Sequence, residues 1–149
     1  MSTEIRNMTP NANLYEQIRL LYVQVLSMFL GMHHNYKKIK AKVIDTALIK
    51  YIHLIDKGFY DDNGKFSWQN IRLLMPPNLE ENIRMKYVML NENEIRLCCL
   101  VLFDVDVNDI SDILPYKRNT LYVMKTRIKH KTGMTNLKED LRHFVMAVS

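Results

Sequence analysis

The sequence has few of the residues that end regular structure, with four glycines and four prolines among 149 residues. A sandwich or barrel of short strands needs many turns, so this scarcity argues against an all-β fold. Ten methionines and few runs of β-branched residues favour helices over strands. Hydrophobic residues make up 48% of the chain, which is enough to build a core. The composition therefore predicts an all-α protein.

Cysteine is scarce too, and the two that are present, Cys98 and Cys99, are adjacent. They lie inside an apolar helical pattern, and nothing near them supplies the spacing of a zinc site. We interpret them as two small buried side chains of a protein in the reducing cytoplasm. His33 and His34 are also adjacent. On a helix they point about 100° apart, which suits a helix end or an exposed position better than a shared metal ion.

Catalytic motifs and long hydrophobic runs are missing as well. The sequence contains no glycine-rich phosphate loop, zinc-protease motif or nucleophile elbow, so we expect neither an enzyme nor a bound cofactor. The apolar run over 20–32 has 13 residues, which is too short to span a bilayer. The first residues are polar and lack the pattern of a signal peptide. We therefore expect a cytoplasmic chain without membrane contact.

Helical periodicity predicts an N-terminal helical region over residues 1–77, followed by a second region over 78–149. Gly58 is expected to end a helix and Ser67 to cap one. The helices expected in the first region span 14–33, 36–57 and 67–74. The apolar residues of the first of these occupy more than one stripe: Leu14, Ile18, Leu21, Val25, Met28 and Phe29, widened by Tyr22, Val23, Leu26 and Leu30. Such a helix must be buried on several sides, in a core or against a partner chain.

The second region opens with a clear helix start. Asn91 can cap a helix through its side chain, and Glu94 follows at the spacing of a capping box. Asp104 or Asp106 is expected to cap the third helix of this region and Asn119 the fourth, which Gly133 ends. After a helix over 79–88, the sequence predicts a helix-turn-helix domain of four helices, which span 92–103, 107–114, 120–131 and 137–148.

The expected helix over 120–131 divides into two faces. Leu121, Met124 and Ile128 recur at core spacing, whereas Tyr122, Val123 and Thr126 lie opposite. Six basic residues and no acidic one lie between positions 117 and 131. The preceding helix is acidic instead, through Asp104, Asp106, Asp109 and Asp112, so this acidic edge is expected to face away from the DNA backbone. Basic side chains that hold phosphates beside a few that reach base edges are what DNA recognition needs, and the net charge of +5 is compatible with it.

Residues 90–134 resemble the LuxR-like helix-turn-helix of bacterial response regulators, most closely the version at the C-terminus of regulators from Bacteroides-type bacteria. The family pattern Leu-Thr-x-x-Glu-Ile-Arg-x-Cys-x-Leu stands at 90–100 as Leu-Asn-Glu-Asn-Glu-Ile-Arg-Leu-Cys-Cys-Leu. Its Glu-Ile-Ala-x-Leu-Leu stands at 109–114 as Asp-Ile-Ser-Asp-Ile-Leu. Its Asn-Thr-Val motif, with a later isoleucine and lysine, stands at 119–131 as Asn-Thr-Leu, Ile128 and Lys131.

The resemblance implies a DNA-binding transcriptional regulator whose helix over 120–131 enters the major groove of double-stranded DNA. Base contacts would come from Tyr122, Val123 and Thr126. The full set of candidate DNA-binding residues is Lys117, Arg118, Asn119, Thr120, Tyr122, Val123, Lys125, Thr126, Arg127, Lys129 and Lys131. The resemblance also implies a homodimer formed through the N-terminal helices, in a chain that is either a short regulator or the end of a longer one.

The sequence departs from the family pattern at three positions. Asp104 replaces a glycine between two helices, Ser111 replaces a small alanine where helices cross, and Thr132 replaces a leucine. Asp104 adds negative charge to the domain. An alternative interpretation is therefore a helical protein-interaction module that retains the helix-turn-helix without strong DNA binding.

Overall fold

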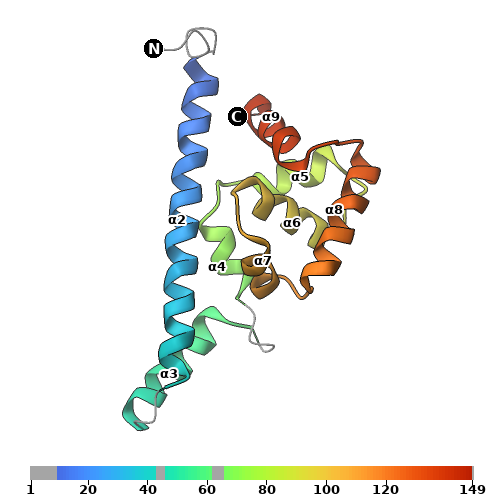
Figure 1. The fold of residues 1–149 in the computed structure, drawn as a ribbon. Coiled ribbons are helices and arrows are strands. Elements are labelled where there is room, and N and C mark those ends of the chain that lie inside the picture. Colours follow the sequence, from blue (N-terminus) through green and yellow to red (C-terminus); the bar gives the residue numbers. More distant parts are fainter. Residues whose placement is uncertain (1–9, 43–45, 62–65, 149) are drawn as a thin grey trace.

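The described part of the chain is entirely helical. A computed structural model describes residues 10–42, 46–61 and 66–148, and in them an isolated antiparallel bridge between Tyr60 and Phe66 is the sole β-type pairing. The predicted all-α fold is confirmed (Figure 1). The helices are α2 (Pro10–Lys40), α3 (Thr46–Phe59), α4 (Trp68–Leu73), α5 (Leu79–Lys86), α6 (Glu92–Leu102), α7 (Val107–Ile113), α8 (Arg118–Thr132) and α9 (Leu137–Val148).

Helix α2 is longer than the sequence predicts. The prediction that one helix ends at His33 and another begins at Tyr36 is wrong, because α2 continues through both residues to Lys40. No glycine or proline interrupts this stretch, and three lysines in its last turn interact favourably with the negative end of the helix dipole. Helix α3 begins at Thr46, and Gly58, the predicted stop, lies one residue before its end.

Two smaller differences concern one helix start and one helix end. Ser67 stands at the N-cap position of α4, but its side chain makes no capping hydrogen bond. The helix predicted over 79–88 ends at Lys86, and the Tyr87 N–H donates to the Ile83 carbonyl in its last turn. None of the described helices combines the length and the apolar character needed to cross a membrane.

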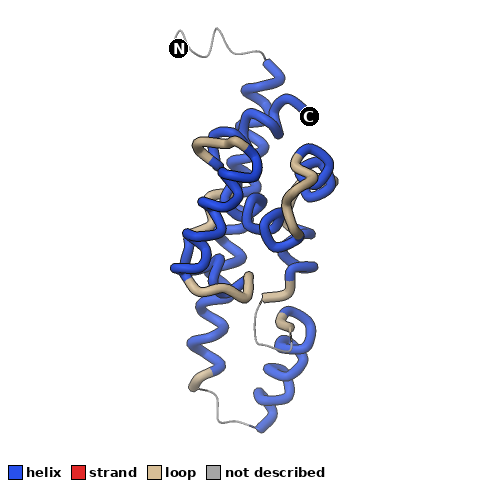
Figure 2. Tube along the Cα trace, turned by 90° about the vertical axis from the view of Figure 1, so that its right-hand side faces the viewer, coloured by secondary structure: helices blue, strands red, loops and turns tan. Residues whose placement is uncertain are grey.

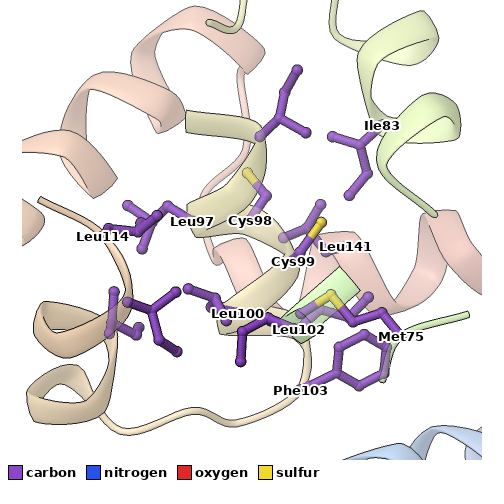
Figure 3. Close-up of a cluster of buried hydrophobic side chains, with 14 of the residues drawn as sticks. Met75, Ile83, Leu97, Cys98, Cys99, Leu100, Leu102, Phe103, Leu114 and Leu141 are labelled. Carbon is purple, nitrogen blue, oxygen red and sulfur yellow. The ribbon is translucent and has the colours of Figure 1, made fainter. Parts of the chain in front are cut away.

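Helix α6 is the centre of the core. The predicted capping box is present, since the Asn91 side chain accepts from the Glu94 N–H and the Glu94 carboxylate accepts from the Asn91 N–H. Cys98 and Cys99 are buried between α5 and α9, close to Ile83 and Leu141 (Figure 3). Burial raises the pKa of the Cys98 thiol to about 12, so both cysteines act as small apolar side chains, as expected.

Helix α2 lies along one side of the helices that follow it (Figures 1 and 2). Leu26 and Leu30 are buried there, and Tyr22 packs on Phe103 with ring centroids 5.7 Å apart. These residues belong to the same hydrophobic cluster as α6, so one continuous core contains side chains from both predicted regions.

The turn between α6 and α7 contains a strained residue. Asp104 has a φ of 61°, in the left-handed region that favours glycine. A glycine, which has no Cβ, would adopt this conformation without strain. Asp104 also pairs with Arg19 of α2 and Lys138 of α9, which joins the turn to two other helices.

We predict that Asp104→Gly gives a protein more stable than Asp104→Ala by about 1 kcal/mol in the free energy of unfolding. Both substitutions remove the carboxylate and its ion pairs, so the difference between them isolates the backbone conformation. Urea denaturation followed by circular dichroism measures it. An alanine variant as stable as the glycine variant would show that residue 104 carries no strain.

Candidate DNA interface

Helices α7 and α8 are packed together and joined by a short segment (Figure 1). Asp106 caps α7, since its carboxylate accepts from the Asn108 N–H at 2.8 Å. The predicted cap of α8 is wrong: α8 begins at Arg118, so Asn119 lies in its first turn, and Lys117 occupies the N-cap position without a side-chain capping bond. The helix begins earlier in the chain than predicted because the Leu121 N–H donates to the Lys117 carbonyl at 3.1 Å, which makes Lys117 the N-cap residue. Gly133 ends the helix as predicted, with a φ of 78°.

The two faces of α8 are divided as the sequence predicts. Leu121, Met124 and Ile128 are buried against the core. Tyr122 and Val123 are 47% and 56% exposed, and Thr126 is exposed as well. Large apolar side chains this exposed are available for contact with another molecule.

Tyr122 is the centre of a cationic cluster on the exposed face. Its hydroxyl lies 3.4 Å from two guanidinium nitrogens of Arg118, one turn earlier. The ammonium of Lys125 lies 5.7 Å from the centre of the Tyr122 ring. The hydrogen bond that Arg118 donates to the Tyr122 hydroxyl raises the pKa of Arg118, which keeps that guanidinium charged. The cluster therefore places two cations around one aromatic ring at the N-terminal half of α8.

The exposed face of α8 keeps most of its positive charge unneutralised. Within the described residues, no ion pair with an acidic side chain involves the following five: Lys117, Arg118, Lys125, Arg127 and Lys129. Asn119 and Thr120 are exposed beside the first two of these. This surface, the α8 basic face, can hold several anionic groups at once.

Lys131 differs from the other basic residues. Its ammonium lies 2.7 Å from a carboxylate oxygen of Glu94, which is fully buried. The same oxygen accepts from the Asn91 N–H at 2.9 Å. Lys131 therefore links the end of α8 to the start of α6, a role that its place in the basic run did not indicate. Glu94 of the predicted capping box was the sequence signal for this pair, because a buried carboxylate needs a cation beside it.

The acidic residues before α8 are turned toward α2. Asp109 accepts from His34 at 2.6 Å, and Asp112 lies 3.7 Å from the ammonium of Lys37. Together with the pairs of Asp104, these contacts cover the acidic edge with basic side chains, most of them from α2. The sequence predicts that this edge faces away from DNA, and the structure shows what neutralises it.

The two adjacent histidines have different surroundings. His34 is exposed, as expected, whereas His33 is buried, 5% exposed, and lies in mid-helix; for His33 the prediction is wrong. The His33 Nδ1 lies 2.5 Å from the Tyr60 hydroxyl, and burial lowers the pKa of His33.

His34, Asp109 and Asp112 bring ligand-type atoms within 4.8 Å of one another. The ammonium of Lys37 already occupies this acidic cluster, which competes with a metal cation there.

Comparison with known proteins gives no further assignment. No protein-family model, curated protein or solved structure matches the chain.

We predict that Lys131→Met lowers the free energy of unfolding by about 2 kcal/mol, because it removes a partner from the buried Glu94 carboxylate. The matched control is Lys129→Met, which removes an exposed lysine that has no acidic partner among the described residues, and it should change stability by less than about 0.5 kcal/mol. Adding Glu94→Gln to Lys131→Met should recover part of the loss, since the amide oxygen keeps the capping bond without the charge. Equal stability of the two lysine variants would contradict this role.

Proposed function

We propose that this chain is a DNA-binding transcriptional regulator that reads double-stranded DNA with the α8 basic face. The observation that carries the proposal is the separation of charge across the helix-turn-helix. Five cations of α8 have no acidic partner among the described residues, while the acidic residues before it are paired with α2 or used as a helix cap. A surface of this kind attracts a phosphate backbone without presenting carboxylates to it.

The dimensions of α8 suit the major groove. Its 15 residues give a length of about 22 Å, and a major groove about 12 Å wide admits one α-helix. Lys117 and Arg118 lie at the N-terminus of the helix, where the helix dipole also favours a phosphate. Lys125 and Lys129, one turn apart, can reach a second stretch of backbone.

The exposed residues between these cations are the proposed base readers. The Thr126 hydroxyl donates to the Tyr122 carbonyl at 3.2 Å, which leaves its oxygen lone pairs to accept from a base edge. The methyl groups of Val123 suit the methyl group of thymine. Tyr122 can approach a base with its hydroxyl or its ring edge. The phosphate contacts then position the helix, and these three side chains supply sequence preference.

The salt dependence of binding tests the proposal. We expect that Lys125→Ala and Lys129→Ala each reduce the slope of log K against log salt by about one, because each removes one phosphate contact. Lys57→Ala, which removes an exposed lysine of α3, is the matched control and should leave the slope unchanged. Fluorescence anisotropy with duplexes selected from a genomic fragment library provides the measurement.

Val123→Ala separates base reading from phosphate binding. It should relax the sequence preference of the selected duplexes and leave the salt slope unchanged. Absent or salt-insensitive binding across the whole library would contradict the proposal. If a pull-down then recovered one tight protein partner and no DNA, the alternative of a helical protein-interaction module would be favoured.

A further inference from the structure

Four side chains with metal-binding atoms meet where α2 faces α7. His34 of α2 and Asp109 and Asp112 of α7 each bring one ligand atom to within 4.8 Å of the other two. His33, the residue before His34, adds a fourth, since its Nε2 lies 3.8 Å from a carboxylate oxygen of Asp112. Imidazole nitrogens and carboxylate oxygens are both ligands of zinc. These four residues are called the His–Asp cluster below.

The Nε2 of His33 is the atom that ordinary ion pairs leave unexplained. The residue is 5% exposed, and among the described residues this nitrogen has no hydrogen-bond partner. Its distance of 3.8 Å from Asp112 is too long for a hydrogen bond. Buried polar atoms are nearly always partnered, so an unpartnered one indicates a functional role or a bound ion. A cation between His33 and Asp112 gives this nitrogen its partner.

The other nitrogen of the same ring fixes its orientation. The His33 Nδ1 lies 2.5 Å from the Tyr60 hydroxyl. When that hydroxyl accepts from Nδ1–H, the lone pair of the ring is on Nε2, the nitrogen beside Asp112. Histidine ligands usually donate a hydrogen bond from the nitrogen that is not bound to the metal. Tyr60 is therefore a positioning residue for His33.

The two histidine rings have a spacing that suits one shared ion. Their centroids are 5.4 Å apart. Zn–N bonds are about 2.0–2.1 Å long, so two imidazole rings on one tetrahedral zinc have centroids about 5 Å apart. The adjacency of His33 and His34 argues against a shared ion only while α2 is considered alone. In the structure, the carboxylates of Asp109 and Asp112 lie beside both rings, and the His34 Nε2 is 2.6 Å from Asp109.

We propose that the His–Asp cluster binds one zinc ion through its two Nε2 atoms and its two carboxylates. The carboxylates neutralise the divalent ion, and the imidazoles favour zinc over Mg²⁺ or Ca²⁺, which prefer oxygen ligands. Ligand atoms on a tetrahedral zinc are about 3.3 Å apart, so the cluster must contract by roughly 1 Å. Side-chain rotation supplies this movement, because the side chains of His34 and Asp112 are 47% and 31% exposed.

Lys37 is the cation that zinc must replace. Its ammonium lies 3.7 Å from Asp112, but its side chain is 52% exposed and can turn into solvent. Exposed ion pairs of this kind contribute little to stability, so they compete weakly with a coordinated metal. Coordination by residues of α2 and α7 cross-links these two helices, and α7 packs on α8. The bound ion therefore fixes the long N-terminal helix to the helix pair that contains α8, whether or not the chain binds DNA.

Zinc titration of the untagged full chain by isothermal calorimetry tests the site. We expect one zinc ion per chain. Loss of an outer-shell partner already costs about 10–100-fold in metal affinity, so His34→Gln and Asp109→Asn should each weaken binding by at least about tenfold. The matched control is His53→Gln, which removes an exposed histidine of α3 and should leave the affinity unchanged. Lys37→Met removes the competing ammonium and should strengthen binding.

Three results of this titration would overturn the site. They are no zinc binding by the wild-type chain, an affinity that the two ligand variants leave unchanged, and equal weakening by His53→Gln. Both ligand variants replace partly exposed side chains, so circular dichroism should show them as helical as the wild type.

Nitrogen NMR of the histidine rings identifies the ligating atoms. His33 lies in the core, so this measurement tests its role without a substitution. Zinc should shift the Nε2 signals of His33 and His34 and leave those of the exposed His53 and His130 unchanged. Shifts at His53 or His130, or at His34 with His33 unchanged, would overturn the proposed ligand set. Zinc binding without DNA binding would leave this inference standing and remove the proposed function, and DNA binding without zinc binding would do the reverse.

Discussion

The burial of α6 on every side is the constraint on which the rest of the fold depends. Leu97, Cys98, Cys99 and Leu100 are successive residues, so they point in all directions around the helix, and each is buried. A helix of this kind is stable only when other helices surround it, and α5 and α9 pack directly on it (Figure 3). The ion pair between Glu94 and Lys131 then fixes the far end of α8 to the start of α6. The exposed face of α8 is therefore held by a rigid core rather than by a loop.

Electrostatics organise the surface around that core. The acidic residues beside α7 are next to the cations of α2, whereas the cations of α8 have no acidic partners among the described residues. Exposed pairs of this kind contribute little to stability individually. Their consequence is a difference in charge between two sides of one small domain. Helix α2 therefore serves two purposes, since it completes the core and neutralises part of the acidic edge.

Local patterns were sufficient to predict the features that depend on neighbouring residues. The capping box at Asn91, the glycine at the end of α8 and the buried and exposed faces of α8 all follow from short-range spacing. Features that depend on distant partners were missed. Nothing near Lys131 indicates its pairing with Glu94, and nothing near His33 indicates that Tyr60 covers it. The predicted break at 33–36 is wrong because these residues include no glycine or proline, so α2 continues through them to Lys40.

The central claim is that α8 is the surface that meets DNA, and NMR chemical shifts of the full chain with a selected duplex test it most directly. The account predicts that the largest shifts on titration fall on Lys117, Tyr122, Lys125, Thr126 and Lys129. The exposed residues of α2 and α3 should remain close to their free values. Shifts concentrated on α2 or α3 with α8 unchanged, or no shifts at a saturating duplex concentration, would contradict the account.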